Sequence, residues 1–242
     1  MKEISYKSST GCLCYKESSM DLSTFKDYIK KHPITFILLL LNTMMLFIVI
    51  FTGGFTNFNL VRWGAIFPPL IIDNQEFNRL IAAMFLHGSI PHYLFNSVAL
   101  YYLGGHMERL IGPRWYVVLY MGSGLLSSLL VTYLGDLNAV TIGASGAIFG
   151  IMGGLFMLTI KQKKWFHPRT IRSIQQLMVM NLVITFLVPN ISILGHLGGL
   201  MMGLAILFFF TPKYPYFYVQ QMKQWRKFIV FLLFNALFLG LW

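Results

Sequence analysis

Two polar side chains stand in glycine-rich openings of long apolar runs, and together they could carry out nucleophilic chemistry. Ser145 lies in the segment Gly-Ala-Ser-Gly-Ala-Ile-Phe that begins at Gly143, and His196 lies in the segment Gly-His-Leu-Gly-Gly. A serine hydroxyl becomes an effective nucleophile when a neutral imidazole takes its proton. The pair therefore suggests a buried nucleophile and its base, whereas the alternative is a serine that only serves helix packing.

Two further polar residues could stabilise negative charge formed at such a serine. His92 and Asn96 are four residues apart in one apolar run, so they would share a helix face. Both side chains, and the backbone N–H of Ser145, can donate hydrogen bonds to an oxyanion. The alternative for His92 and Asn96 is hydrogen bonding that holds neighbouring helices together. For His87, just before this run, a role in loop structure is favoured over catalysis.

Glycine spacing indicates how the serine and the histidine could meet. The small residues at helical spacing are Gly146, Gly150 and Gly154 after the serine, and Gly199 and Gly203 after His196. Such faces let membrane helices approach backbone to backbone. Because His196 falls on the glycine face, its ring is expected inside the bundle, where it needs a partner. Phe149, one turn after the serine, could stack on that ring or be an ordinary core aromatic.

The composition requires that most of the chain lies in lipid. Of 242 residues, 56% are hydrophobic and 11% are charged, and the mean hydropathy is +0.65. Soluble domains carry about 25% charged residues. A chain of this length has too little interior to bury the excess of apolar side chains. The sequence therefore predicts an all-α, polytopic membrane protein.

The apolar runs divide the chain into a core and two flanking segments. We expect a basic tail (1–33), a six-span core (34–210) with a long outer loop (53–80), a polar linker (211–227) and a seventh span (228–242). The expected core spans are 34–51, 89–110, 115–133, 142–160, a fifth that ends near 188, and 193–210. Because the last run has only 15 residues, six spans with an interfacial tail are the alternative.

The distribution of basic residues indicates orientation. With seven alternating spans, all but two of the 19 Lys and Arg fall on one side, and the exceptions are Arg62 and Arg79. Because cytoplasmic loops carry an excess of Lys and Arg, the N-terminus is placed in the cytoplasm and the C-terminus outside a cell membrane. Ser145 and His196 then lie near the outer face. The net charge of +11 is thus an orientation signal, and no nucleic-acid partner is expected.

Other chemistries have less support in the sequence. The spans hold no acidic residue near enough to complete a triad, since Glu108 lies at the cytoplasmic end of the second span. Cys12 and Cys14 are interpreted as ordinary tail residues. No cofactor is expected, and no metal either, because the chain lacks a His-Glu-x-x-His helix. A Ser–His dyad is the most that the residues themselves support.

From about residue 76 to residue 203, the sequence resembles the rhomboid family of intramembrane serine proteases. The matching segments, in order, are Glu76–Arg79, His87–Asn96, Tyr102–Glu108, Gly143–Gly146, and Gly195–Gly199 with Gly203. Each is a weak signal by itself, but all five in sequence are specific. The resemblance implies that Ser145 is the nucleophile and His196 its base. It also implies that His92 and Asn96 line the oxyanion site and that Phe149 packs on the histidine.

The same resemblance implies a substrate class and marks two departures. The implied substrates are transmembrane segments of membrane proteins in the lipid bilayer, cleaved near the outer face. Arg79 matches the arginine of a Trp-Arg pair in the family's first loop, but Asn78 stands in the tryptophan position. Ala83 replaces a histidine found in some members.

Three other functions remain as alternatives. The first is a catalytically silent rhomboid-like protein that binds membrane clients. The second is a transporter or channel in which Ser145, His196, His92 and Asn96 line a polar path. The third is a metalloprotease that uses His87, His92 and His196 as ligands.

Overall fold

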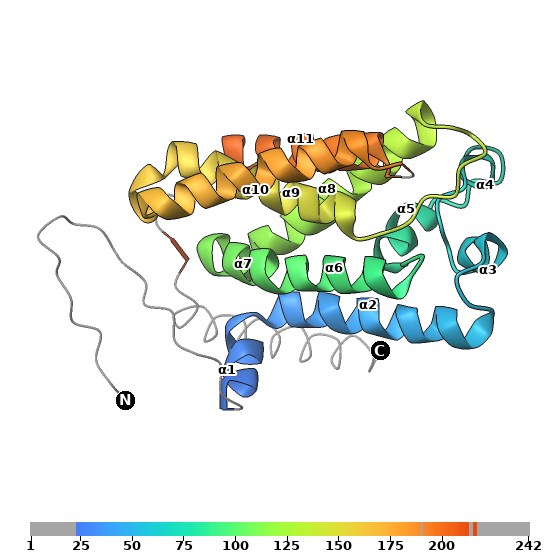
Figure 1. Ribbon diagram of the computed structural model, residues 1–242, viewed down its shortest axis with the longest axis horizontal. Helices are drawn as coiled ribbons and strands as arrows, with labels where there is room; N and C mark the ends of the chain where they lie inside the picture. Colours follow the sequence, from blue (N-terminus) through green and yellow to red (C-terminus); the bar gives the residue numbers. More distant parts are fainter. Residues whose placement is uncertain (1–22, 190, 213–214, 217–242) are drawn as a thin grey trace, which may run out of the picture.

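The structure, a computed structural model, describes residues 23–189, 191–212 and 215–216, which form a bundle of helices (Figure 1). Over these ranges the one β-type pairing is an isolated bridge between Ile66 and Thr141, and no strand is formed. The predicted all-α class is therefore confirmed.

In chain order the elements are α1 (Ser23–Lys31), α2 (Pro33–Thr52), α3 (Asn57–Arg62), α4 (Pro68–Ile72), α5 (Arg79–Ala82), η1 (Ala83–Phe85), α6 (Ile90–Ala99), η2 (Leu100–Gly104), α7 (Gly105–Ile111), α8 (Pro113–Leu134), α9 (Ser145–Lys161), η3 (Lys163–Trp165), α10 (Pro168–Leu187) and α11 (Ile193–Phe209).

A helix lies over each of the six apolar runs between residues 34 and 210. By length and hydropathy, α2, α8 and α10 are sufficient to cross a bilayer, whereas α9 and α11 are shorter apolar helices of 17 residues each. The run at 89–110 is a continuous helix, α6–η2–α7, with a π-helical segment at η2. The predicted seventh span (228–242), residues 1–22 with Cys12 and Cys14, and most of the linker lie outside the described residues.

The centre of the bundle is α9, which packs against both α8 and α11, and its backbone almost touches that of α11. A Cβ atom added to Gly199 would lie 1.8 Å from the carbonyl oxygen of Gly146, and one added to Gly203 would lie 2.0 Å from that of Gly150. On its other side, a Cβ on Gly150 would lie 2.0 Å from Ser123 Oγ. These glycines therefore set the distance between the two helices that begin at Ser145 and just before His196.

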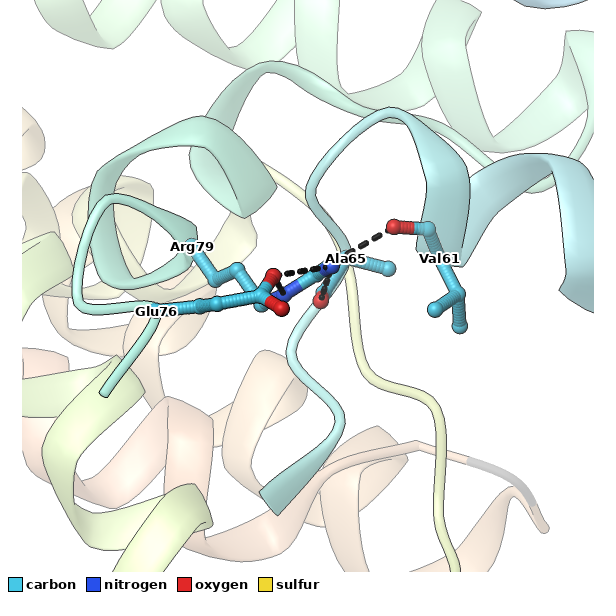
Figure 2. A network of polar contacts seen from close by, with 4 residues as sticks. All are labelled: Val61, Ala65, Glu76 and Arg79. Atoms are coloured by element: carbon cyan, nitrogen blue, oxygen red, sulfur yellow. Dashed lines mark hydrogen bonds and ion pairs between the residues drawn. The ribbon is translucent and has the colours of Figure 1, made fainter. Parts of the chain in front are cut away.

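The outer loop (53–80) is more ordered than a simple connection, because it folds into α3, α4 and the start of α5 at one end of the bundle (Figure 1). Figure 2 shows the contacts that hold it. Arg79, 7% exposed, donates from Nε to Glu76 at 2.7 Å and from Nη1 to the carbonyl oxygens of Val61 and of Ala65, the latter at 3.2 Å. Asn78 is exposed. Arg79 thus anchors the loop although the residue before it is Asn78 rather than tryptophan.

At the opposite end of the bundle, Glu108 joins α7 to α2. Its buried carboxylate accepts hydrogen bonds from the backbone N–H groups of Ile34 and Thr35, both at 2.9 Å, and from Thr35 Oγ1 at 2.7 Å. A carboxylate at a helix N-terminus satisfies unpaired N–H groups and interacts favourably with the helix dipole. This acid therefore has a capping role far from Ser145.

Candidate active site

Ser145 is the first residue of α9 and follows a non-helical segment that is held in place by the outer loop. Thr141 pairs with Ile66 through two backbone hydrogen bonds of 2.9 Å, and the Gly143 N–H donates to the Ala83 carbonyl at 2.9 Å. Gly143 has φ +122°, a conformation that side chains rarely adopt and that no helix contains. For this reason α9 begins three residues later than the apolar run at 142 predicted. Ser145 consequently sits at the helix N-terminus, where its backbone N–H has no partner within the helix.

His196 lies in the first turn of α11, at the same end of the bundle. Ser192 is the N-cap residue of α11, and its Oγ accepts a hydrogen bond of 3.1 Å from the Gly195 N–H. His196 is 9% exposed, and its ring stacks on Phe149, with ring centroids 4.0 Å apart and an interplanar angle of 17°. Because Phe149 is one turn after Ser145 on α9, this contact holds the imidazole over the serine's own helix face.

Ser145 and His196 line the same small cavity between α8, α9 and α11. The other polar side chains around it are Ser127, Ser128, Thr141 and Ser192. Its volume of about 20 Å³ exceeds the roughly 10–15 Å³ that one water molecule requires, and the lining supplies polar partners for it. The site can therefore hold a nucleophile, a base and a water molecule together.

His92 approaches this site from α6. A Cβ added to Gly143 would lie 3.0 Å from His92 Nε2 and 3.6 Å from Ser145 Oγ, so the two side chains flank the same glycine. His92 Nδ1 accepts a long hydrogen bond of 3.5 Å from the Gly88 N–H. A neutral imidazole that accepts at one nitrogen carries its proton on the other. His92 Nε2, which lies on the side of Gly143 that Ser145 also borders, would then carry the proton.

Asn96 and His87, also singled out in the sequence, have different surroundings. Asn96 is 7% exposed, and among the described residues its Nδ2 has no hydrogen-bond acceptor. An amide donor left free in a buried position is available to a ligand. His87 is 1% exposed and packs edge-on against His92 and Tyr93, with ring centroids 5.2 and 5.5 Å apart. Within the described ranges, no three His, Cys, Asp or Glu residues are grouped as metal ligands.

One contact of the candidate base was not foreseen from the sequence. The Nδ1 atom of His196 lies 2.8 Å from Oγ1 of Thr185, a residue of α10 that is 1% exposed. The sequence contains no signal for this pair, because a threonine in an apolar helix usually bonds only to its own backbone. Only the packing of α10 against α11 brings the two together.

Comparisons with known proteins place most of this chain in one family. The rhomboid domain family matches residues 74–213. "Rhomboid protease GluP" of Bacillus subtilis is 33% identical over 174 residues, 72% of this chain and 34% of that protein, so the chain spans about a third of its length. "Putative rhomboid protease YdcA" of the same organism is 28% identical over 197 residues, 78% of this chain and 94% of that protein. "Rhomboid-type serine protease 2" of Emericella nidulans is 34% identical over 141 residues, 54% of this chain and 26% of that protein.

The family match covers more than half of the 242 residues and includes every helix from α5 to α11. It also contains Ser145 and His196, the two residues that share the cavity. The chain belongs to the rhomboid family.

Proposed function

We propose that this protein is an intramembrane serine endopeptidase that cleaves transmembrane segments of other membrane proteins through a Ser145–His196 dyad. One observation carries the proposal. Ser145, the first residue of α9, and His196, in the first turn of α11, line one cavity, and the His92 ring and the Ser145 hydroxyl flank the same glycine, Gly143. That the relatives quoted above are named as rhomboid proteases supports the same reaction class.

In the first half of the reaction, Ser145 attacks a substrate carbonyl. A bond forms between Ser145 Oγ and the carbonyl carbon, and the hydroxyl proton passes to Nε2 of His196. The oxyanion that develops accepts hydrogen bonds from the Ser145 N–H, His92 Nε2–H and Asn96 Nδ2–H. The positive end of the α9 dipole adds to this stabilisation, because Ser145 stands at the helix N-terminus.

The second half releases both products and restores the enzyme. The imidazolium of His196 gives its proton to the leaving amine as the C–N bond breaks, which leaves an ester on Ser145. A water molecule in the cavity then loses a proton to His196 and attacks this ester. The acid is released and the serine hydroxyl is restored. Phe149, stacked on the imidazole, would keep the ring in one plane through both steps.

The substrate is proposed to reach the site within the bilayer, near its outer face. The excess of Lys and Arg on the other side of the spans supports a cytoplasmic N-terminus and a site at the outer end, in a multi-pass protein of the cell membrane. A helical substrate would have to unwind there, since the peptide carbonyls of a helix are shielded by their own hydrogen bonds. Segments with small and helix-breaking residues fit this requirement.

The proposal is tested by cleavage of a model single-span protein in proteoliposomes. Ser145→Ala and His196→Ala should each abolish cleavage while the protein still inserts and keeps its melting temperature. A chelator should leave the wild-type rate unchanged. Undiminished cleavage by Ser145→Ala would refute the dyad, and a rate lost on chelation would favour a metalloprotease. If the wild-type protein captures the substrate without cleaving it, the protein is a silent member that binds clients.

A further inference from the structure

We propose that Thr185 is a positioning residue that fixes the tautomer of His196, and so takes the place that an acidic residue holds in a catalytic triad. This inference rests on the proposed function, because it concerns the base of the dyad. No sequence motif points to Thr185. Its assignment comes from two hydrogen bonds and from its burial.

The two hydrogen bonds decide the direction of the contact. Thr185 Oγ1 donates to the backbone carbonyl of Asn181, one turn earlier on α10, at 2.8 Å. A hydroxyl has a single proton, so with that proton used Thr185 can only accept from the histidine. The 2.8 Å contact between Thr185 Oγ1 and His196 Nδ1 is therefore an Nδ1–H···O bond. Asn181 is held in turn, since its side chain donates to the Leu177 carbonyl at 2.8 Å.

The consequence for chemistry concerns the other ring nitrogen. A neutral imidazole with its proton on Nδ1 presents an unshared pair at Nε2, which is what a general base for Ser145 requires. Without a partner at Nδ1, the ring can carry its proton on Nε2 instead and cannot act as the base. When Nε2 accepts the serine proton, the Thr185 oxygen also stabilises the imidazolium. The stacked Phe149 ring fixes the plane of the imidazole but does not select its tautomer.

Thr185 is also set apart from the rest of α10 by its burial. All 20 residues of α10 are described, and Thr185 is the one among them that is fully buried, at 1% exposed. Across the spanning stretch of α10 only 6% of residues are buried, against 44% for α8. Leu177, Met178 and Leu182 of α10 are only partly buried against the cluster that contains Phe149, so the hydroxyl that α10 places against the base is its most deeply buried side chain. The position of α10 therefore affects which tautomer His196 adopts, and so whether Nε2 can accept the serine proton.

Three variants separate this role from simple packing. Thr185→Val keeps the shape but removes the acceptor, and kcat should fall about tenfold, equivalent to about 1.4 kcal/mol, with little change in KM. Thr185→Ser keeps the hydroxyl and should restore activity to within about twofold. Thr132→Val is the matched control, because Thr132 is buried on α8 and makes the same bond to the carbonyl four residues earlier, at 2.8 Å. It should leave kcat unchanged.

A spectroscopic measurement tests the tautomer without reference to catalysis. Protein labelled with ¹⁵N-histidine in the Ser145→Ala background distinguishes Nδ1–H from Nε2–H by its ring nitrogen shifts. The His196 signal, assigned by its loss in His196→Gln, should show Nδ1–H, and Thr185→Val should convert it to a mixture or to Nε2–H.

Two results would overturn the inference: an Nε2–H signal in the parent protein, or a signal and kcat that Thr185→Val leaves unchanged. If the wild-type protein cleaves nothing, the proposed function fails, yet the nitrogen shifts still decide whether Thr185 holds the tautomer.

Discussion

Replacing Gly199 with alanine tests whether helix packing positions the dyad. The added Cβ would lie 1.8 Å from the carbonyl oxygen of Gly146, whereas an ordinary contact needs at least 3.4 Å. The obstacle is backbone, so no side chain can rotate away. The axes of α9 and α11 must therefore separate, or one helix must shift, by the difference of about 1.6 Å. Because Gly199 is three residues after His196, that shift moves the base away from Ser145.

Gly199→Ala should lower both the stability of the fold and the rate of cleavage, the rate by more. Overpacking of a close interface costs about 1–3 kcal/mol, of which the better helix propensity of alanine recovers up to about 1 kcal/mol. The expected net loss of stability is about 1–2 kcal/mol, visible as a lower melting temperature. Catalysis is more sensitive, because a displacement of about 1 Å in a catalytic group lowers the rate by about 10²-fold. The rate of Gly199→Ala should thus fall much more than the folded fraction.

Cleavage of a single-span substrate in proteoliposomes, with the melting temperature measured on the same preparation, separates the two effects. Gly122→Ala is the matched control, since its Cβ would meet the flexible end of Ile206 on α11 at an ordinary 3.4 Å. The control should keep its activity and melt no lower than wild type. If Gly199→Ala kept both its rate and its melting temperature, the close packing of α9 on α11 would not be what positions the dyad.

Two other substitutions probe the oxyanion donors and the outer loop. Asn96→Ala should lower kcat by about 10²-fold with a small effect on KM, as expected for one oxyanion donor, and a change confined to KM in steady-state cleavage would contradict that role. Arg79→Met breaks the Glu76 ion pair and the bonds to two loop carbonyls. The free energy of unfolding should therefore fall by about 1–3 kcal/mol, and the melting temperature should fall with it. The exposed Arg62 supplies the control: Arg62→Met should melt like wild type, and equal melting of the two variants would refute the anchoring.

The helices were the most predictable part of the fold, because in lipid every backbone group must bond within its own segment. Even the polar run at 89–110, with His92 and Asn96, is one continuous helix. The start of α9 was less predictable. Ile142 is apolar and continues the run, but its segment pairs with the outer loop at Ile66, and a contact between such distant residues has no local signature.

In the candidate site, too, residues with a local sequence signal could be predicted, and those that depend on distant packing could not. Ser145 and His196 could be singled out because two glycine-rich apolar stretches carry one a serine and the other a histidine, and helical spacing placed Phe149 one turn from the serine. Thr185 could not be found, since its importance depends on how α10 packs against α11 rather than on its neighbours in sequence. The anchoring by Arg79 was harder to predict, because Asn78 stands where the family's Trp-Arg pair has its tryptophan. The structure shows that the arginine's contacts are made without the tryptophan.

The dyad is tested most directly by mapping where a fluorophosphonate probe attaches to the protein in liposomes. Ser127, Ser128 and Ser192 line the same cavity as Ser145 and serve as internal controls. Peptide mass spectrometry should locate a single adduct on Ser145, and His196→Ala should abolish it. An adduct on one of the other cavity serines, or one formed on Ser145 at the wild-type rate in His196→Ala, would contradict the assignment of Ser145 as nucleophile and His196 as its base.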